Sequence, residues 1–232
     1  MCGRFTLTYR ERMALADELG VPVHEIADAE YRARYNIAPT DPHWIVRLRY
    51  EDRQALPAKW GLVNTWAKDA KRAAAQINAR GETLSKQPAF REAFQKRRCV
   101  VPADGFFEWV GTKQARQPVW FHRPDGKLIL FAGLYESWQP RPGEWERTFT
   151  IVTTVPNRLI EPIHDRMPVI LADDRVDAWL DPRQDDEEKL TRLLVPAPDD
   201  LLVRTFVSPR VNSVRNDDPE CLEPVEMAGR LL

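Results

Sequence analysis

The second residue of this chain offers two nucleophiles at once. The sequence opens Met1-Cys2-Gly3, and a small second residue favours removal of the initiator Met. Cys2 then carries an α-amine, whose pKa is ordinarily about 7.7–8.0, and a thiol, whose pKa is ordinarily about 8.5, so both are expected to be partly available at neutral pH. The amine of such a 1,2-aminothiol forms an imine with an aldehyde, and the sulfur then closes a five-membered thiazolidine. Taken alone, position 2 favours the alternative interpretation, a Cys that happens to lie in a frayed terminus.

Glu108 is the second candidate for chemistry. It lies between Phe107 and Trp109, whose side chains would face the other side of a strand. If Glu108 faces a pocket wall, desolvation raises the pKa of its carboxyl and makes it a usable general acid. Periodicity alone slightly favours the alternative, a solvent-facing Glu on an edge strand.

His164 is the third candidate and stands in the run Ile163-His164-Asp165-Arg166-Met167-Pro168. An imidazole with a pKa near ~6.5 suits a proton shuttle. The alternative is a surface-loop His or one hydrogen-bonded in the core. No His/Cys spacing resembles a zinc site, so no metal is expected.

Forked donors and one aromatic side chain suggest contacts with nucleic acid. Asn78, Arg80 and Arg166 could hold sugar oxygens or phosphates, or could stabilise loops. Trp66 is followed by Lys68, Lys71 and Arg72. An exposed aromatic among cations is a stacking platform for unpaired bases, and a Trp that anchors its loop to the core is the alternative.

Composition sets the class of protein. The chain has 232 residues, 43% of them hydrophobic, and a net charge of −1, which excludes a global attraction for nucleic acid but permits a local basic groove. No apolar run has the character of a secretory signal or a membrane span, and position 2 is not Gly, which excludes myristoylation. The three Cys form no Cys-x-x-Cys pair, so a reducing cytoplasm is the expected location.

The elements that must position these residues are short and numerous. A capping-box pattern, Thr8-Tyr9-Arg10-Glu11, predicts a helix with Met13, Ala16 and Leu19 on one face, closed by Gly20. Residues 28–42 are expected to be a loop and residues 64–81 an irregular polar stretch, with Cys99 in a buried strand and Cys221 in a polar loop. Further helices are predicted over 88–96, 174–180 and 185–194, and strands over 43–50, 55–62, 99–101, 106–110, 118–122, 128–135, 148–154 and 201–207. We therefore expect one α+β domain over residues 1–232, with a predominantly antiparallel, barrel-like β core and flanking short helices.

Six motifs in order resemble one family, the SOS-response-associated peptidase (SRAP) family of abasic-site crosslinking proteins. The resemblance covers nearly the whole chain. One departure follows Trp60-Gly61, where the family usually has a Pro and this chain has Val63-Asn64-Thr65, which weakens the assignment of the following loop. The motifs are Met1-Cys2-Gly3-Arg4-Phe5, Tyr35-Asn36-Ile37-Ala38-Pro39, Trp60-Gly61-Leu62, Ile77-Asn78-Ala79-Arg80 with Glu82, Ala103-Asp104-Gly105-Phe106-Phe107-Glu108-Trp109, and Ile163-His164-Asp165-Arg166-Met167-Pro168.

The resemblance implies a specific chemistry. In the family the mature N-terminal Cys attacks the ring-opened aldehyde of an abasic site in single-stranded DNA and forms a thiazolidine crosslink that protects the site. Cys2 matches the nucleophile. Asn78 and Glu108 match residues that sense the abasic sugar, Glu108 also giving and taking protons, and His164 matches the residue that positions the open sugar and shuttles protons.

The resemblance also implies a DNA-binding surface. Arg4, Arg80 and Arg166 match phosphate contacts, while Pro39 and Trp66 match a wedge that interrupts base stacking. Asn36, in the motif that contains Pro39, is assigned to the same surface. The implied partner is single-stranded DNA with abasic sites, with no cofactor, no metal and a monomeric protein.

Two other functions remain open from the sequence. A cysteine peptidase would use Cys2, His164 and Glu108 as nucleophile, base and orienting residue. A non-covalent single-stranded DNA-binding module would use Trp66 and the arginines and be indifferent to Cys2. The α-amine discriminates, because blocking it stops thiazolidine formation and spares a peptidase. Met1 removal could be performed by the cell or by an autoproteolytic activity of the domain.

Overall fold

A closed ring of five strands forms the centre of the molecule. The computed structural model describes residues 2–27, 31–71, 73–112 and 115–226. Strand β3 pairs with β4 and β6, β6 with β9, and β9 with β10, all antiparallel, and β10 closes the ring by pairing in parallel with β4. The core is therefore a predominantly antiparallel barrel, as predicted. Its strands are β3 (Pro42–Arg49), β4 (Asp52–Trp60), β6 (Arg98–Ala103), β9 (Ile129–Arg141) and β10 (Glu144–Thr154).

Two short strands extend the barrel beside β10 and carry predicted site residues. Strand β5 (Asn78–Arg80) pairs in parallel with β10, and β11 (Met167–Pro168) pairs with it antiparallel. The irregular stretch predicted over 64–81 thus ends in a strand. Because both strands border β10, they bring the Asn78 motif and the His164 motif to the same side of the barrel.

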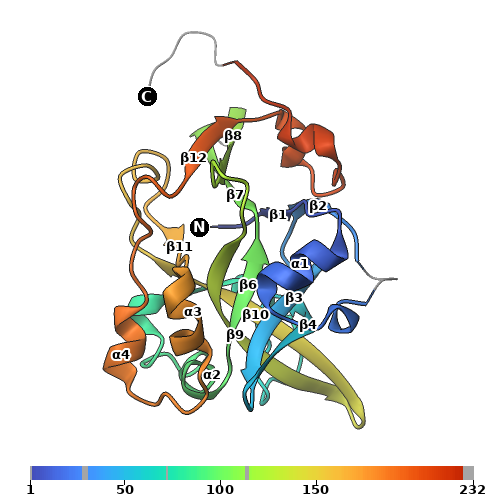
Figure 1. Ribbon diagram of the computed structural model, residues 1–232, viewed down its shortest axis with the longest axis vertical. Helices are drawn as coiled ribbons and strands as arrows, with labels where there is room; N and C mark the ends of the chain where they lie inside the picture. Colours follow the sequence, from blue (N-terminus) through green and yellow to red (C-terminus); the bar gives the residue numbers. More distant parts are fainter. Residues whose placement is uncertain (1, 28–30, 72, 113–114, 227–232) are drawn as a thin grey trace.

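A second sheet lies across one end of the barrel, at the top of Figure 1. Its order is β12-β8-β7-β1-β2, and every pairing is antiparallel. Gly105 begins β7 where a Cβ would lie 2.1 Å from Trp120 Nε1, so a side chain there would displace β8. The strands are β1 (Phe5–Leu7), β2 (Arg34–Ile37), β7 (Gly105–Thr112), β8 (Ala115–His122) and β12 (Val203–Phe206).

Short helices flank the two sheets. In Figure 1, α2, α3 and α4 gather beside one side of the barrel and α1 lies on the other. Each predicted helix is present, with ends shifted by a few residues. The α-helices are α1 (Arg12–Leu19), α2 (Arg91–Lys96), α3 (Asp173–Leu180) and α4 (Glu187–Arg192), and the 3-10 turns are η1 (Val23–Glu25), η3 (Ala73–Ala75), η4 (Gly81–Thr83), η5 (Pro209–Asn212) and η6 (Pro219–Leu222).

The start of α1 corrects two local predictions. Glu11 is the N-cap and makes no side-chain capping bond, while the Thr8 hydroxyl and amide donate to Asp104 at 2.5 and 2.6 Å. The predicted capping box is wrong because the carboxylate of Asp104, distant in the sequence, accepts both hydrogen bonds that Thr8 donates. Met13 is exposed, and Leu15 takes the core place expected for it. Gly20 ends the helix at φ 65°, as predicted.

Two further segments differ from the prediction because of long-range pairing. Residues 34–37, expected in a loop, form β2 because β1 offers a free edge to them; residues 28–30 of that loop lie outside the described residues. Cys221, expected in a polar loop, is buried in η6 in a cluster with Phe107 and Val207. Cys99 is buried in β6, as predicted.

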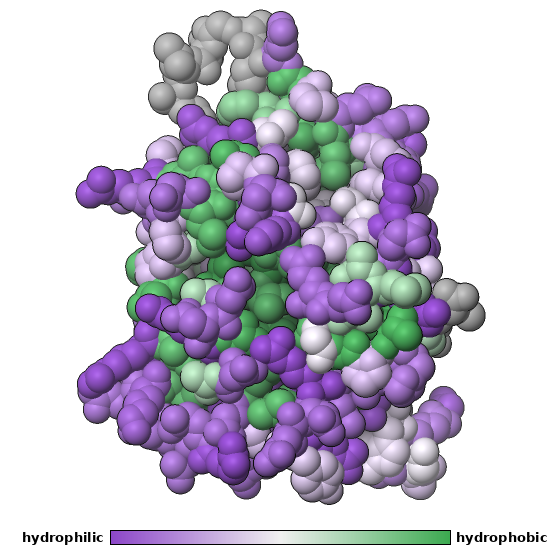
Figure 2. Space-filling model, in the orientation of Figure 1, coloured by the Kyte–Doolittle hydropathy of each residue, from purple (hydrophilic) through white to green (hydrophobic). Residues whose placement is uncertain are grey.

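The surface is mostly polar. On the face seen in Figure 2, hydrophilic side chains cover the lower part and much of the outline, and apolar ones gather toward the centre. No helix in the described part of the chain has both the length and the apolar character needed to cross a membrane.

Candidate active site

The N-terminal segment enters the junction between the two sheets. Strand β1 pairs with β7, and the Arg4 carbonyl accepts from the Phe107 amide at 3.0 Å. From the barrel side, Asn78 Nδ2 donates to the Cys2 carbonyl at 2.8 Å. The side chain of Cys2 is fully buried as a result. Cys2 is therefore held from both sheets.

Burial changes the chemistry expected of the Cys2 thiol. Desolvation, together with the nearby charge of Glu108, raises the thiol pKa far above its usual value. The Sγ donates weakly to the Arg4 carbonyl at 3.7 Å. The expectation that the thiol is partly ionised at neutral pH is therefore not met in this structure, because desolvation outweighs the interactions that lower the thiol pKa.

Glu108 is buried in β7, as the pocket-wall alternative requires. It is only 4% exposed, and burial raises the pKa of its carboxyl to about 7. The charge of Asp165 acts in the same direction. At neutral pH the carboxyl is thus divided between its acid and base forms, the state in which one group both gives and takes protons well.

His164 lies in the turn that precedes β11. Its Nδ1 accepts from the Arg166 amide at 2.9 Å and lies 2.9 Å from Asp165 Oδ1. Burial lowers the pKa of the imidazole, so the neutral ring is favoured. The interaction of Asp165 with Glu108 indicates that this turn faces β7.

Arg166 fixes the same turn to the barrel. Its guanidinium binds Glu82 at 2.7 and 2.9 Å, and Nη2 donates to the Thr153 carbonyl at 2.8 Å. A forked donor matches a carboxylate in this bidentate way. The predicted phosphate-binding group is thus engaged with the protein itself.

Arg4 and Asn36 join β1 and β2 to the C-terminal segment. Arg4 Nη1 donates to Asn36 Oδ1 at 2.9 Å and to the Val211 carbonyl at 3.0 Å. The side-chain nitrogen of Asn36, Nδ2, also donates to the carbonyls of Val211, Ser213 and Asn216. Asn36 is buried, so it acts in this structure by holding Arg4 and residues 211–216 in place.

The remaining predicted DNA contacts lie on the surface. Trp66 is 68% exposed, Arg80 at the end of β5 is exposed, and Pro39 is half-buried in the turn before β3. The structure thus divides the ten predicted site residues by exposure, and the exposed Trp66 and Arg80, with the half-buried Pro39, are called the rim below. Cys2, Asn36, Glu108 and Arg166 are buried, and Arg4, Asn78 and His164 are half-buried.

The loop that carries Trp66 is anchored on both sides despite its departure from the family pattern. Asn64 donates to the Ala89 carbonyl at 2.6 Å, and the Trp138 indole donates to the Ala67 carbonyl at 2.8 Å. A cavity of about 410 Å³ adjoins it, lined in part by Trp66, Lys68 and Lys71. The side chain that anchors the loop is Trp138, and Trp66 is left exposed; Arg72 lies outside the described residues.

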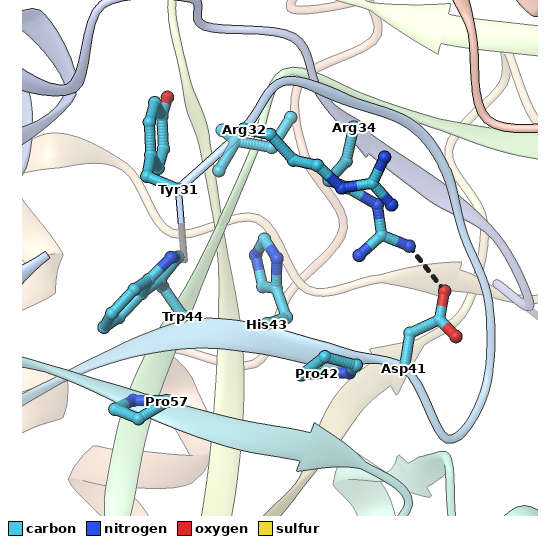
Figure 3. A pocket seen from close by; sticks show the side chains of 9 residues that line it. Tyr31, Arg32, Arg34, Asp41, Pro42, His43, Trp44 and Pro57 are labelled. Carbon is cyan, nitrogen blue, oxygen red and sulfur yellow. Dashed lines mark hydrogen bonds and ion pairs between the residues drawn. The ribbon is translucent and has the colours of Figure 1, made fainter. Parts of the chain in front are cut away.

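A second cavity, of about 570 Å³, lies between β2 and β3 (Figure 3). Arg34 binds Asp41 at 2.7 Å and Asp217 at 2.5 Å, and His43 Nε2 donates to the Pro102 carbonyl at 2.8 Å. Burial lowers the pKa of His43 to about 3, so this ring is neutral. The ion pair fixes the turn that carries Pro39.

Sequence reasoning missed several groups that support the site. Glu82 was part of a quoted motif but had no role, and Asp217 accepts the amides of Tyr35 and Asn36. Trp109 stacks against the guanidinium groups of Arg4 and Arg116 at 5.9 and 5.8 Å. A lone Asp or Trp gives no sequence signal for such distant partners.

Comparison with known proteins first defines the class. A crystal structure of a protein from Bacteroides thetaiotaomicron superimposes with a TM-score of 0.86 at 25% identity, over 97% of this chain and 100% of that chain. A crystal structure from Bordetella bronchiseptica gives a TM-score of 0.73 at 27% identity, over 89% and 100%. The architecture is thus one already seen in other bacterial proteins.

Sequence comparison then gives the family. The family model described as SOS response associated peptidase (SRAP) matches residues 1–214, and this chain belongs to that family. It is 39% identical over 224 residues to "Abasic site processing protein YoqW" of Bacillus subtilis, covering 96% of this chain and 99% of the relative. It is 33% identical to "Abasic site processing protein HMCES" of Rattus norvegicus, covering 85% of this chain and 67% of the relative.

Proposed function

We propose that this protein processes abasic sites in single-stranded DNA by forming a thiazolidine crosslink through Cys2. The relatives named above are abasic site processing proteins. The observation that carries the proposal is the placement of Cys2, directly after Met1, beside a carboxyl whose pKa is about 7. Once Met1 is removed, Cys2 is the residue of this chain whose amine and thiol can both reach one carbon.

The reaction begins with the α-amine. The hemiacetal of the abasic deoxyribose opens to an aldehyde, and the amine adds to C1′. The carbinolamine loses one water molecule and becomes an imine. The raised pKa of the Cys2 thiol supports this order, because a protonated thiol is a weak first nucleophile.

Ring closure follows on the same carbon. The sulfur adds to the imine carbon, the C=N electron pair passes to nitrogen, and the thiol proton is transferred to that nitrogen. Glu108 in its base form takes the thiol proton, and in its acid form it returns it. The overall change is the loss of one water, with no oxidant, reductant or cofactor required.

Asn78 fits a contact with the open sugar. Asn78 Nδ2 is used by the Cys2 carbonyl, whereas its buried Oδ1 has no hydrogen-bond partner among the described residues. An unsatisfied buried acceptor is costly unless a ligand satisfies it. A sugar hydroxyl supplies the donor that this oxygen lacks.

The exposed rim fits a single strand. Arg80 offers a cation at the end of β5, and Trp66 offers a flat surface on which an unpaired base can stack. Pro39 lies in a turn held by the Arg34–Asp41 ion pair. A continuous duplex would have to unstack at such a rim, at a cost of a few kcal/mol per step.

A cysteine peptidase is the second candidate, and the state of Cys2 disfavours it. Cysteine peptidases depend on a thiolate whose pKa is lowered by an imidazolium. Here burial raises the thiol pKa, burial also lowers the imidazole pKa of His164, and both groups are thus biased toward their neutral forms. The family name alone favours this function.

Intact mass after incubation with abasic single-stranded DNA tests the proposal. The mature protein should gain the mass of the oligonucleotide less one water, in a heat-stable product. Cys2→Ala should give no such product, and acetylation of the α-amine should prevent it while leaving reversible DNA binding. A full yield from Cys2→Ala, or from the acetylated protein, would contradict the mechanism.

A further inference from the structure

The cavity between β2 and β3 has no part in the chemistry proposed above (Figure 3). Its volume of about 570 Å³ lies within the range of roughly 300–1,000 Å³ that is typical of pockets for small organic ligands. Figure 3 shows the rings of Tyr31 and Trp44 on one side of it and the side chains of Arg34 and Asp41 on the other. The lining thus combines flat ring surfaces with a few polar groups that can orient a ligand.

The balance of charge in the wall disfavours an anionic ligand. Arg34 donates through Nε to Asp217 and through Nη2 to Asp41. Arg32 donates through Nη2 to the same oxygen of Asp217. Two guanidinium groups are thus matched by two carboxylates, so no net positive charge remains to hold a phosphate.

The polar atoms that remain available suit the edge of a nucleobase. Among the described residues, no group donates to Asp41 Oδ1, since Arg34 and the Ala38 amide both use Oδ2. The Arg32 side chain is 66% exposed and uses only Nη2 within the described part of the chain, which leaves Nε–H and Nη1–H as donors. Base edges present N–H donors next to oxygen or nitrogen acceptors, so an acceptor and donors on one cavity match them.

Tyr31 supplies the accessible ring. Its side chain is half-buried, and its hydroxyl donates to the Tyr9 carbonyl at 2.7 Å, which holds the ring at the cavity wall. The Trp44 side chain is almost fully buried, so it supports the wall from behind. Stacking on a fixed aromatic ring accepts any base, because every base has a flat face.

The place of the cavity links it to the proposed reaction. Phe5, the first residue of β1, pairs with Ile37, the last residue of β2. Cys2 precedes β1 and Pro39 follows β2, so both lie at the same end of this strand pair. Asp41, on the cavity wall, follows Pro39 by two residues, at most about 7 Å of chain. A DNA strand that passes from Cys2 over the Pro39 turn therefore reaches the cavity within a few nucleotides.

We propose that this cavity binds one base of the DNA strand close to the abasic site, stacked on Tyr31 and hydrogen-bonded to Asp41 and Arg32. The inference rests on the proposed function, because it takes the abasic site to be bound at Cys2. The base is turned out of the strand at the Pro39 turn, while its phosphate stays outside the cavity. Turning out a base costs least in a single strand, where no pairing has to be broken.

Deleting bases one at a time along the strand tests this site. Each DNA carries one reactive abasic site, and one other nucleotide is replaced by a tetrahydrofuran spacer, which has neither a base nor an aldehyde. The dependence of the single-turnover crosslinking rate on protein concentration gives an apparent Kd and a maximal rate. At one position the deletion should raise the Kd by about 5- to 150-fold, the range for one base–aromatic stack, and leave the maximal rate unchanged.

Two substitutions of Tyr31 assign that position to the cavity. In Tyr31→Leu the ring is lost, so the intact strand and the strand with the spacer should have equal Kd values. Tyr31→Phe keeps the ring and loses only the bond to Tyr9, so it should still prefer the intact strand. Trp66→Ala is the control for the other stacking surface and should abolish the effect of a spacer at a different position.

Arg32→Ala distinguishes a base from a phosphate. The exposed side chain makes this variant a mild change to the fold. Loss of its donors should reduce the effect of the spacer by about fivefold, the contribution of one hydrogen bond, and leave the log–log salt slope of binding unchanged. A slope shallower by about 0.7 would assign the cavity to a phosphate and overturn the inference.

A photocrosslink locates the base without the thiazolidine reaction. A strand with tetrahydrofuran in place of the abasic site cannot react with Cys2, and 5-iodouracil is placed at the sensitive position. Irradiation should attach this base to a peptide that contains Tyr31 or Trp44. Attachment only to peptides outside the cavity, or a spacer profile that is the same in Tyr31→Leu and the wild type, would overturn the inference. If the wild type forms no adduct at all, the proposed function fails, and 5-iodouracil placed at each position in turn still decides whether a base enters the cavity.

Discussion

The buried cluster and the exposed rim of the site obey different physical rules. Around Cys2 and Glu108, water is excluded, backbone and side-chain groups are fixed by hydrogen bonds from two sheets, and pKa values are displaced. Trp66 and Arg80 are exposed. The comparison teaches that the groups assigned to the proposed chemistry have lost their solvent, whereas the groups assigned to the proposed DNA contacts keep theirs.

This contrast predicts where a small chemical change has a large effect. In a buried cluster, one altered group changes the protonation of its neighbours, because charges interact strongly where water is absent. On the rim, salt and water screen each contact, so the contacts contribute independently and weakly. The following predictions run from the cluster to the rim.

The largest effect is expected from Cys2→Ser. The variant keeps the α-amine and loses the sulfur, so it should form at most an imine. Trapping with borohydride should capture this imine, whereas heating without reductant should leave no adduct. A heat-stable product at wild-type yield would show that sulfur is unnecessary.

Glu108→Gln should slow crosslinking by about 10²- to 10⁴-fold, the usual contribution of a positioned general acid or base. The wild-type rate should show an ionisation near pH 7, and this ionisation should be missing from the variant, because the pKa of Glu108 is about 7. Single-turnover rates from pH 5 to 9 measure both. Glu144→Gln, at the exposed β9–β10 turn, is the control; equal profiles for all three proteins would remove Glu108 from the mechanism.

The same Glu108→Gln variant should be more stable than the wild type at high pH. Because the folded-state pKa is raised from about 4.5 to about 7, the folded protein retains a proton that the unfolded chain loses, and stability falls as pH rises between these values. The variant avoids this loss, which is at most about 3 kcal/mol. Urea unfolding at pH 5 and pH 8 measures it, and the advantage of the variant should appear only at pH 8.

Trp66→Ala should weaken binding of abasic single strands by about 1–3 kcal/mol, the contribution of one base–aromatic stack. Fluorescence anisotropy measures the Kd. Trp145→Ala is a closely matched control, since Trp145 is 67% exposed and lies in β10 near the β9–β10 turn. If Trp66→Ala and Trp145→Ala weaken binding equally, Trp66 makes no specific stacking contact with the DNA.

Arg80→Ala should give the smallest effect. Removing one phosphate contact should make the log–log salt dependence of binding shallower by about 0.7 for a single strand. Titrations at several salt concentrations measure the slope. Arg141→Ala, in the distant β9–β10 hairpin, should leave the slope unchanged.

The sequence could predict features that depend on local signals, and it could not predict those that depend on distant partners. Barrel strands were predictable because alternation and turn residues are local signals. The burial of Glu108 could not be predicted, because an alternating pattern does not show which face of a strand meets a second sheet. The Thr8–Asp104 bond, β2 and the Glu82–Arg166 pair depend on distant partners, such as Leu7 for Arg34 in β2, for which a single sequence carries no local signal.

The pairing of both ends of the chain has a consequence for synthesis. Arg4 is held by the carbonyl of Val211, and residues 35–36 by Asp217, although the N-terminal residues leave the ribosome first. These bonds can therefore form only after residues 211–217 have been translated. A chain that stops before Val211 lacks the partners that hold Arg4, Tyr35 and Asn36 in this structure.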